Sequence, residues 1–223
     1  MSETVRLIEV KENVLADNDA FAKELQQELK KKKTFLLNLM SSPGAGKTSI
    51  VLATIGKLKS DLKIGVMEAD IDSTVDAEKV AAAGVEAIQI RTGGFCHMDA
   101  TMVKDGLDAI GYQDFDLVIL ENVGNLVCPA EFETGAIKNA MILSVPEGDD
   151  KPLKYPLMFS VCDVLLVNKM DYLELSDFSI EKMTEYVKKI NQNIEIIEIS
   201  CKTGQGVDLW TKWLKDQIAS FAG

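Results

Sequence analysis

Short apolar runs alternate along the chain with segments whose apolar residues recur at helical spacing. Each apolar run is short enough to be one buried strand, while spacings of three and four residues indicate a helix with one apolar face. The runs predict strands at 34–40, 63–69, 85–90, 116–121, 139–145, 163–168 and 194–199. The segments between them predict helices near 47–60, 76–83, 98–110, 178–191 and 206–221. Alternation of this kind is typical of a three-layer α/β fold, in which helices cover both faces of a mostly parallel sheet.

A further helix is predicted near the N-terminus, at 14–31. Its apolar residues form one stripe, at positions 14, 15, 21, 22, 25 and 29. The basic run Lys30–Lys33 follows at the end where cations are favoured by the helix dipole. The most loop-like segment is 144–156, but it is too short to divide domains. We find no repeat and no low-complexity linker, so residues 1–223 are predicted to form a single domain.

The composition narrows the classes of partner. Hydrophobic residues make up 47% of the chain and charged residues 26%, which is ordinary for a globular protein. A net charge of −11 argues against nucleic acid as a partner. The apolar runs are too short to span a bilayer, and the charged N-terminus does not read as a secretory signal. The four cysteines have no disulfide-framework spacing. We therefore expect a cytoplasmic protein that binds neither membranes nor nucleic acid.

A phosphate-binding motif follows the strand at 34–40. The sequence Ser41–Thr48, SSPGAGKT, is a Walker A loop in the required strand–loop–helix setting, and only Ser41 departs from the pattern, where glycine is usual. Its glycines let backbone N–H groups face phosphate oxygens at a helix N-terminus. Lys47 can reach the β- and γ-phosphates, and the Thr48 hydroxyl can bind Mg²⁺. The predicted fold is thus a P-loop NTPase, with phosphates contacted by Ser42, Pro43, Gly44, Ala45, Gly46, Lys47, Thr48 and Ser49.

A guanine-reading motif follows the strand at 163–168. The tetrapeptide Asn168–Asp171, NKMD, matches the N-K-x-D signature. The Asp171 carboxylate can accept hydrogen bonds from both N1–H and the exocyclic amine of guanine, a donor pair that adenine lacks. Lys169 can lay its methylene stem along the base. Four residues alone could be a surface turn, but a P-loop in the same sheet favours a guanine nucleotide. The predicted base-binding residues are Asn168, Lys169, Asp171, Ser200, Cys201 and Lys202, with Cys201 a small residue of a tight loop rather than a ligand.

Acidic residues stand where two other predicted strands end. Asp70 ends the strand at 63–69 and Glu121 ends the strand at 116–121. The carboxyl ends of parallel strands form the ligand edge of such a sheet, and Mg²⁺ prefers oxygen ligands. We predict a Mg²⁺ site of Thr48, Asp70 and Glu121. The predicted catalytic residues are Lys47, Thr48, Glu121 and Asp76. Asp72 is an alternative to Asp76 for orienting water, or else a solvated strand-end acid.

The only histidine of the chain stands beside a cysteine. Cys96 and His97 lie in the loop GGFCHMDA, and Cys128 lies seven residues beyond Glu121. Two thiols and an imidazole would suit Zn²⁺ or Ni²⁺ and would leave one coordination position open. By spacing alone, buried thiols with a capping histidine explain the pattern equally well. Cys162, among apolar residues, is expected to be a core thiol.

Five motifs together resemble the HypB family, the GTPases of nickel-hydrogenase maturation in the SIMIBI class of P-loop NTPases. They are SSPGAGKT, RTGGFCHMDA, ENVGNLVCP, EGDDKPLKYP and NKMD, and the resemblance runs from the P-loop to about residue 206. It implies a GTP-dependent homodimer with Cys96, His97 and Cys128 of both chains at a shared metal site, and Lys154 near the nucleotide of the partner subunit. It also implies a HypA-type nickel chaperone and a hydrogenase large-subunit precursor as partners.

Two features of some family members are missing. The chain has no histidine and no cysteine before residue 96, which argues against nickel storage and against a separate N-terminal metal site. The predicted function is a slow GTPase that uses GTP, Mg²⁺ and Ni²⁺ or Zn²⁺ and acts as a nickel-delivery switch. The alternatives are a urease-type nickel GTPase, a family whose metal motif has a proline between Cys and His, and a P-loop kinase with an incidental metal site.

Overall fold

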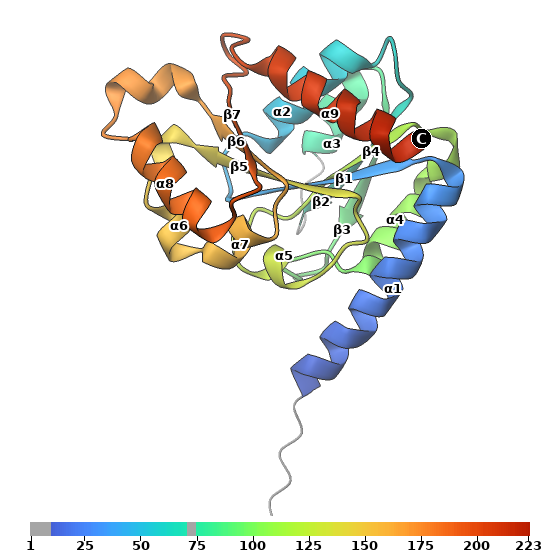
Figure 1. Cartoon of the computed structure of the whole chain (residues 1–223). Coiled ribbons are helices and arrows are strands. Elements are labelled where there is room, and N and C mark those ends of the chain that lie inside the picture. The colour runs from blue at the N-terminus through green and yellow to red at the C-terminus, as the bar shows by residue number, and fades with distance from the viewer. Residues whose placement is uncertain (1–9, 71–74) are drawn as a thin grey trace, which may run out of the picture.

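One parallel sheet of seven strands runs through the molecule (Figure 1). The structure is a computed structural model that describes residues 10–70 and 75–223. The strands are β1 (Phe35–Ser41), β2 (Ile64–Asp70), β3 (Glu86–Arg91), β4 (Leu117–Glu121), β5 (Lys138–Ser144), β6 (Val164–Asn168) and β7 (Glu195–Glu198). Their order across the sheet is β3-β2-β4-β1-β5-β6-β7, and every pairing is parallel.

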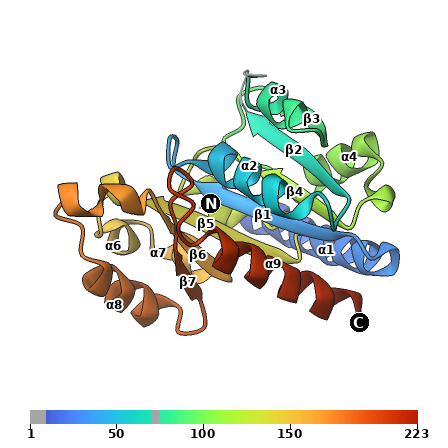
Figure 2. The same cartoon turned by 90° about the horizontal axis from the view of Figure 1, so that it is seen from above.

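Helices cover both faces of this sheet, which explains why all residues of β1 are buried. One face is covered by α2 (Lys47–Leu58), α3 (Val75–Ala82) and α9 (Val207–Ala222). The other face is covered by α1 (Val10–Lys32), α4 (Ala100–Ile110), α7 (Pro156–Ser160) and α8 (Ile180–Ile190). Figure 2 shows α6 (Lys151–Lys154), α7 and α8 at the β6–β7 side, and α3 and α4 at the β2–β3 side.

The sides of β1 show how the layers are built. Leu37 and Leu39 pack with Ile50 of α2 and Trp210 of α9, while Leu36, on the opposite face, packs with residues of α1 and α4. Successive side chains of a strand point to opposite faces, so one apolar run serves two cores.

The predicted fold class is confirmed. Each strand begins within one residue of its prediction. The sheet is parallel throughout rather than mostly parallel. The N-terminal helix starts at Val10, ahead of the predicted 14–31, and ends with Lys30, Lys31 and Lys32 in its last turn, as expected.

The prediction of a loop over 144–156 is wrong. This segment contains a 3₁₀ turn at Val145–Glu147 and the one-turn helix α6. The 3₁₀ turn, α6 and α7 each have proline at the first or second position. Proline is pre-organised for a helix start because its φ is fixed and it has no N–H to satisfy there. The sequence pattern missed these turns because they are too short to show a period.

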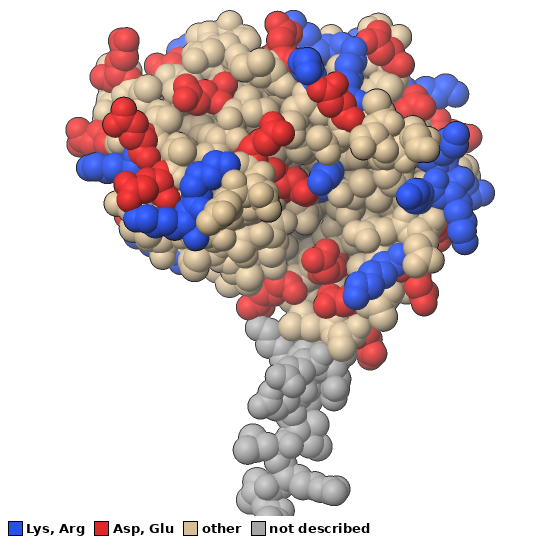
Figure 3. All heavy atoms as spheres, in the orientation of Figure 1, with Lys and Arg blue, Asp and Glu red and all other residues tan. Residues whose placement is uncertain are grey.

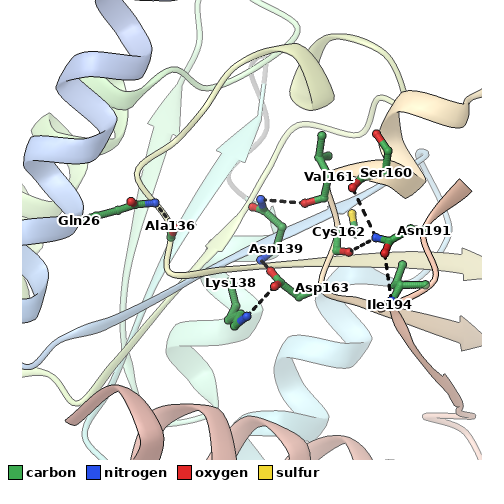
Figure 4. A network of polar contacts seen from close by, with 10 residues as sticks. All are labelled: Gln26, Ala136, Lys138, Asn139, Ser160, Val161, Cys162, Asp163, Asn191 and Ile194. Carbon is green, nitrogen blue, oxygen red and sulfur yellow. Dashed lines mark hydrogen bonds and ion pairs between the residues drawn. The ribbon is translucent and has the colours of Figure 1, made fainter. Parts of the chain in front are cut away.

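The amino ends of β5 and β6 are joined by a polar network (Figure 4). The Asp163 carboxylate accepts a hydrogen bond from Lys138 Nζ at 2.6 Å and another from the backbone N–H of Asn139 at 2.8 Å. Asn191 donates to the Cys162 carbonyl at 2.9 Å. Cys162 is buried, and burial raises the pKa of its thiol, which confirms the expected core thiol. In an open parallel sheet, ligands bind at the opposite edge, outside the carboxyl ends of the strands.

The surface bears charges of both signs. On the face shown in Figure 3, Lys and Arg side chains are interspersed with Asp and Glu side chains. Over the described ranges 10–70 and 75–223, no helix has the length and apolar character needed to cross a bilayer.

Candidate nucleotide site and thiol site

The Walker A loop connects the end of β1 to the first residue of α2, Lys47. Gly44 and Gly46 have left-handed backbones, with φ of 76° and 108°. A Cβ on Gly46 would lie 2.4 Å from Asn168 Nδ2, so only glycine fits. Ser41, the departure from the pattern, has no positive φ and accepts a hydrogen bond from Lys47 Nζ at 3.3 Å. The serine is therefore compatible with the loop.

The guanine motif is bonded directly to the Walker A loop. Asn168 Nδ2 donates to the Ala45 carbonyl at 2.9 Å, and Lys169 Nζ donates to the Gly44 carbonyl at 2.8 Å. Lys169 itself has a left-handed backbone, with φ of 61°. These hydrogen bonds join the loops that follow β1 and β6, so the phosphate and base regions are in direct contact.

Asp171 points at a cavity of about 310 Å³. Ser200 Oγ donates to Asp171 Oδ1 at 2.7 Å, and Lys202 Nζ lies 3.5 Å from Oδ2. The Ser200 hydrogen bond, with the Lys202 charge nearby, lowers the pKa of Asp171, so the carboxylate is ionised at neutral pH. The cavity is lined by Gly46, Ser49, Pro146, Asn168, Lys169, Asp171, Tyr172, Cys201 and Lys202. Sequence reasoning had not singled out Tyr172, whose ring is 5.9 Å from Lys202 Nζ.

Cys201 belongs to this base cavity rather than to a metal site. Burial raises the pKa of its thiol to about 11, so the thiol is neutral at pH 7. This agrees with the expectation of a small residue in a tight loop.

A second cavity, of about 290 Å³, lies beside the Walker A loop. Its lining residues are Pro43, Gly44, Lys47, Glu68, Ala69, Asp70, Gln89, Glu121, Asn122, Val123 and Gly124. Thr48 Oγ1 donates to Glu121 Oε1 at 3.1 Å. Thr48, Asp70 and Glu121 thus lie around one region, and their hydroxyl and carboxylate oxygens are the donor type that suits Mg²⁺.

Glu68 is an additional acidic residue of this cavity. It is the register partner of Glu121 across β2 and β4, and the two side chains are only 3% and 5% exposed. A charged residue inside the apolar run GVMEAD was the signal in the sequence. Two other acidic residues were predicted to orient water. Asp72 lies outside the described residues, and the side chain of Asp76, at the start of α3, is not described either.

Glu147 links the Walker A loop to the segment that follows β5. Its carboxylate accepts from the Ser42 hydroxyl, and also from the backbone N–H and hydroxyl of Ser144 at 2.8 and 2.7 Å. The spacing Ser144-x-x-Glu147 is a capping box, which was the missed sequence signal. Beyond it, Lys154 is paired with Asp150 at 2.5 Å and its side chain is 58% exposed. Lys154 lines neither cavity of its own chain.

Cys96 and Cys128 lie together although 32 residues separate them. Their sulfur atoms are 2.7 Å apart, and both are half-buried free thiols. The hydrogen bond with Cys128, aided by burial, raises the pKa of Cys96. The short helix α5 (Cys128–Glu131), which the sequence pattern did not predict, begins at the second thiol.

His97 lies beside this thiol pair without completing it. Its Nδ1 is 3.9 Å from Cys96 Sγ, and its ring stacks on Phe132 with centroids 3.7 Å apart. Burial lowers the pKa of His97, so the imidazole is neutral at pH 7. Within residues 10–70 and 75–223, no three His, Cys, Asp or Glu side chains are grouped closely enough to hold a metal ion. One chain therefore places two of the three predicted ligands together and the third next to them.

The loop from Glu121 to Cys128 touches both regions. A Cβ on Gly124 would lie 3.1 Å from the backbone nitrogen of Pro43, so this loop packs tightly on the Walker A loop. Asn125 Nδ2 donates to the Cys96 carbonyl at 3.4 Å. The loop is thus in contact with the phosphate-binding backbone at one point and with the thiol-bearing loop at another.

Known proteins share this arrangement of sequence and fold. A family model described as CobW/HypB/UreG, nucleotide-binding domain, matches residues 35–198. Hydrogenase maturation factor HypB of Escherichia coli (strain K12) is 42% identical over 212 residues, which cover 95% of this chain and 73% of that protein. The chain belongs to the HypB family.

Solved structures of HypB agree with the fold. The crystal structure of HypB from Helicobacter pylori in complex with nickel has a TM-score of 0.87 and 36% identity, and covers 92% of this chain and 96% of that one. HypB from Archaeoglobus fulgidus has a TM-score of 0.85 and 37% identity, covering 92% of this chain and all of that chain. The family predicted from the five motifs is therefore confirmed.

Proposed function

We propose that this protein is a GTP-hydrolysing nickel metallochaperone of hydrogenase maturation, in which the nucleotide state controls metal binding at the thiols. The observation that carries the proposal is the loop between Glu121 and Cys128. It begins at a carboxylate bonded to Thr48, packs on Pro43, and ends at a thiol 2.7 Å from another thiol. A change at the γ-phosphate would thus reach Cys128 through seven residues of chain.

Guanine nucleotides bind across the two cavities. Asp171 accepts from the guanine base, Lys169 packs along it, and the backbone of Ser42–Ser49 contacts the phosphates. Bound Mg²⁺, held by Thr48, Asp70 and Glu121, would neutralise charge on the β- and γ-phosphates. Lys47 stabilises the charge that develops as water attacks the γ-phosphorus and the bond to the bridging oxygen breaks. Asp76 is our candidate for orienting that water. We propose that turnover is slow.

A GTP-dependent homodimer completes the metal site in this proposal. One chain supplies two close thiols and an adjacent imidazole, so a second copy of Cys96, His97 and Cys128 would fill the coordination sphere of Ni²⁺ or Zn²⁺. Large exposed apolar side chains support such an interface, and they include Phe95, Val127, Leu153 and Leu157. The exposed Lys154 is available to reach the nucleotide of the partner subunit.

Relatives support nickel and hydrogenase as the biological context. The HypB structure from Helicobacter pylori was solved in complex with nickel, and the Escherichia coli relative is a hydrogenase maturation factor. We propose a HypA-type nickel chaperone and a hydrogenase large-subunit precursor as partners, in the cytoplasm. A second candidate is urease maturation, because a Helicobacter pylori relative with 37% identity is a hydrogenase/urease maturation factor.

The decisive experiment measures nickel and zinc affinity in three nucleotide states. Protein without nucleotide, with GDP, and with a non-hydrolysable GTP analogue is titrated with each metal. Coupling energies of about 1–3 kcal/mol predict affinities that differ roughly 5- to 150-fold between states. Cys96→Ala, His97→Ala and Cys128→Ala should each lose affinity, whereas Cys162→Ala, the core thiol, should keep it.

Two outcomes would contradict the proposal separately. Equal affinities in the three states would leave a GTPase with an unlinked metal site. Unchanged affinity in all three ligand variants would exclude these residues as the metal site. Hydrolysis of GTP in the absence of any acceptor separates the proposed GTPase from a P-loop kinase.

A further inference from the structure

A single amide on α1 contacts both segments that carry the thiols. Asn18 Oδ1 accepts from the backbone N–H of Ala100 at 2.9 Å, and Asn18 Nδ2 donates to the Glu133 carbonyl at 2.9 Å. Ala100 follows Cys96 by four residues, and Glu133 follows Cys128 by five. Neither cysteine is near Asn18 in sequence, so this bridge exists only in the folded chain.

The bond to Ala100 fixes the beginning of α4. Ala100 is the first residue of this helix, and Asp99 is its N-cap. The Asp99 side chain accepts a hydrogen bond from the backbone N–H of Met102 and not from that of Ala100. The first N–H groups of a helix have no partner inside the helix. Asn18 supplies a hydrogen-bond acceptor for the N–H of Ala100. This bond fixes the point at which the segment with Cys96 and His97 enters α4.

The bond to Glu133 fixes the segment that leaves α5. This segment runs along α1 for several residues: Gly135 is so close that a Cβ would lie 2.7 Å from Leu25. Gln26 Nε2 donates to the Ala136 carbonyl at 2.9 Å (Figure 4). The chain from Glu133 to Ala136 is therefore positioned against α1.

The helix that carries Asn18 is itself anchored in the core. Leu25 and Leu29 are buried in one apolar cluster with Val103 and Leu107 of α4. Tyr112 donates to Glu28 at 2.5 Å. Figure 1 shows α1 beside α4 along the sheet. A fixed helix is a suitable reference for two loops that must bring sulfur atoms together.

We propose that Asn18 is a positioning residue of the thiol site, and that its two hydrogen bonds together hold the segments that carry Cys96 and Cys128 so that both thiols can bind one metal ion. The inference rests on the proposed metal-binding function. Metal–sulfur bonds tolerate deviations of only about 0.2 Å. Loss of either bond should therefore change metal affinity, even where the fold is kept.

Three variants separate this role from an ordinary contribution to stability. Asn18→Ala removes both bonds. Asn18→Asp can still accept from Ala100 but cannot donate to Glu133, because a carboxylate has no donor at neutral pH. Gln26→Ala is the matched control, since it removes a bond of the same kind from the same helix to the same segment.

The measurement is a titration of the full-length, reduced protein, bound to a non-hydrolysable GTP analogue, with Ni²⁺. Thiolate-to-nickel charge-transfer absorption reports the site, and competition with a chelator gives the affinity. Loss of a residue that orients metal ligands typically costs 10–100-fold, so Asn18→Ala and Asn18→Asp should each lose about tenfold. Gln26→Ala should stay within about twofold, and thermal unfolding should show Asn18→Asp to be no less stable than Gln26→Ala.

The possible contrary results point to different failures. Equal nickel affinity of Asn18→Ala and Gln26→Ala would overturn the positioning role. Wild-type affinity in Asn18→Asp would show that the bond to Glu133 is not needed, and would overturn the two-bond bridge. A wild-type protein without the charge-transfer band would overturn the proposed function, and this inference with it.

Discussion

The nucleotide region and the thiol region of this molecule are built in different ways. Around the nucleotide cavities, side-chain hydrogen bonds join the loops to one another across the sheet edge: Asn168 to Ala45, Lys169 to Gly44, and Thr48 to Glu121. Around the thiols, the two loops meet at their sulfur atoms, at one ring stack and at one hydrogen bond, from Asn125 to the Cys96 carbonyl. Their outer ends are held by Asn18 from another helix.

This difference teaches how a switch can be arranged. The nucleotide loops are pre-organised, so binding energy is not spent on ordering them. The thiol pair lacks a complete ligand set within the described part of one chain. A metal site that needs ligands from a second subunit can bind or release its metal as the dimer forms or separates. A structural site with all four ligands in one chain has no such dependence.

The largest expected effect comes from the nucleotide region alone. Lys47→Ala should reduce GTP hydrolysis by about 10²–10³-fold, because a charge that stabilises the transferring phosphoryl group is lost. Nickel affinity of the nucleotide-free variant should be unchanged, since Lys47 does not contact the thiol loops. Lys57→Ala, on the same helix but paired with Asp208, is the control. Unaltered turnover in a folded Lys47→Ala protein would contradict the assigned role.

A smaller effect tests whether the base cavity is pre-organised for guanine. Asp171→Asn should weaken GTP binding and favour xanthosine triphosphate, whose C2 carbonyl accepts from the new amide. Hydrogen bonds to charged groups are worth about 1.5–3 kcal/mol, so GTP affinity should fall roughly 10- to 150-fold in a competition assay. Retained preference for GTP would mean that NKMD does not read the base.

The lowered pKa of Asp171 adds a pH test. The ionised form is the one that accepts from guanine, and a depressed pKa keeps it ionised as the pH falls. Wild-type guanine preference should therefore be constant from about pH 8 to about pH 5. Ser200→Ala, which removes the largest cause of the shift, should keep the preference near pH 7.

The smallest effect tests the looser construction of the thiol region. Phe132→Ala removes the ring that stacks on His97 and so loosens the tie between the two thiol loops. Such ring contacts are worth about 0.5–1.5 kcal/mol, so nickel affinity should fall roughly 2- to 12-fold. Phe221→Ala is the control, since that ring on α9 meets Phe35 edge-on, at 5.6 Å, and contacts neither thiol loop. Higher nickel affinity in Phe132→Ala would show that the stack holds His97 away from the metal.

The strands and the Walker A loop were readable from sequence because their signals are local. Residues 35–41 form one largely apolar run, and Gly44 and Gly46 indicate the turn that follows it. Short-range effects of this kind need no knowledge of distant residues. The turns at Val145–Glu147 and Lys151–Lys154 were missed because one turn has no period, although their prolines and the Ser144–Glu147 spacing were visible.

By itself the sequence determined the α/β fold class, the order of the elements, the phosphate and guanine motifs, and membership of the HypB family. Tertiary structure alone decided which distant residues meet: Glu68 beside Glu121, Glu147 on Ser42, and Asn18 between the two thiol segments. Periodicity and motif spacing arise from neighbouring residues, while these contacts depend on strand order and helix docking. Those in turn are fixed by the packing of the whole core, which no local window of sequence contains.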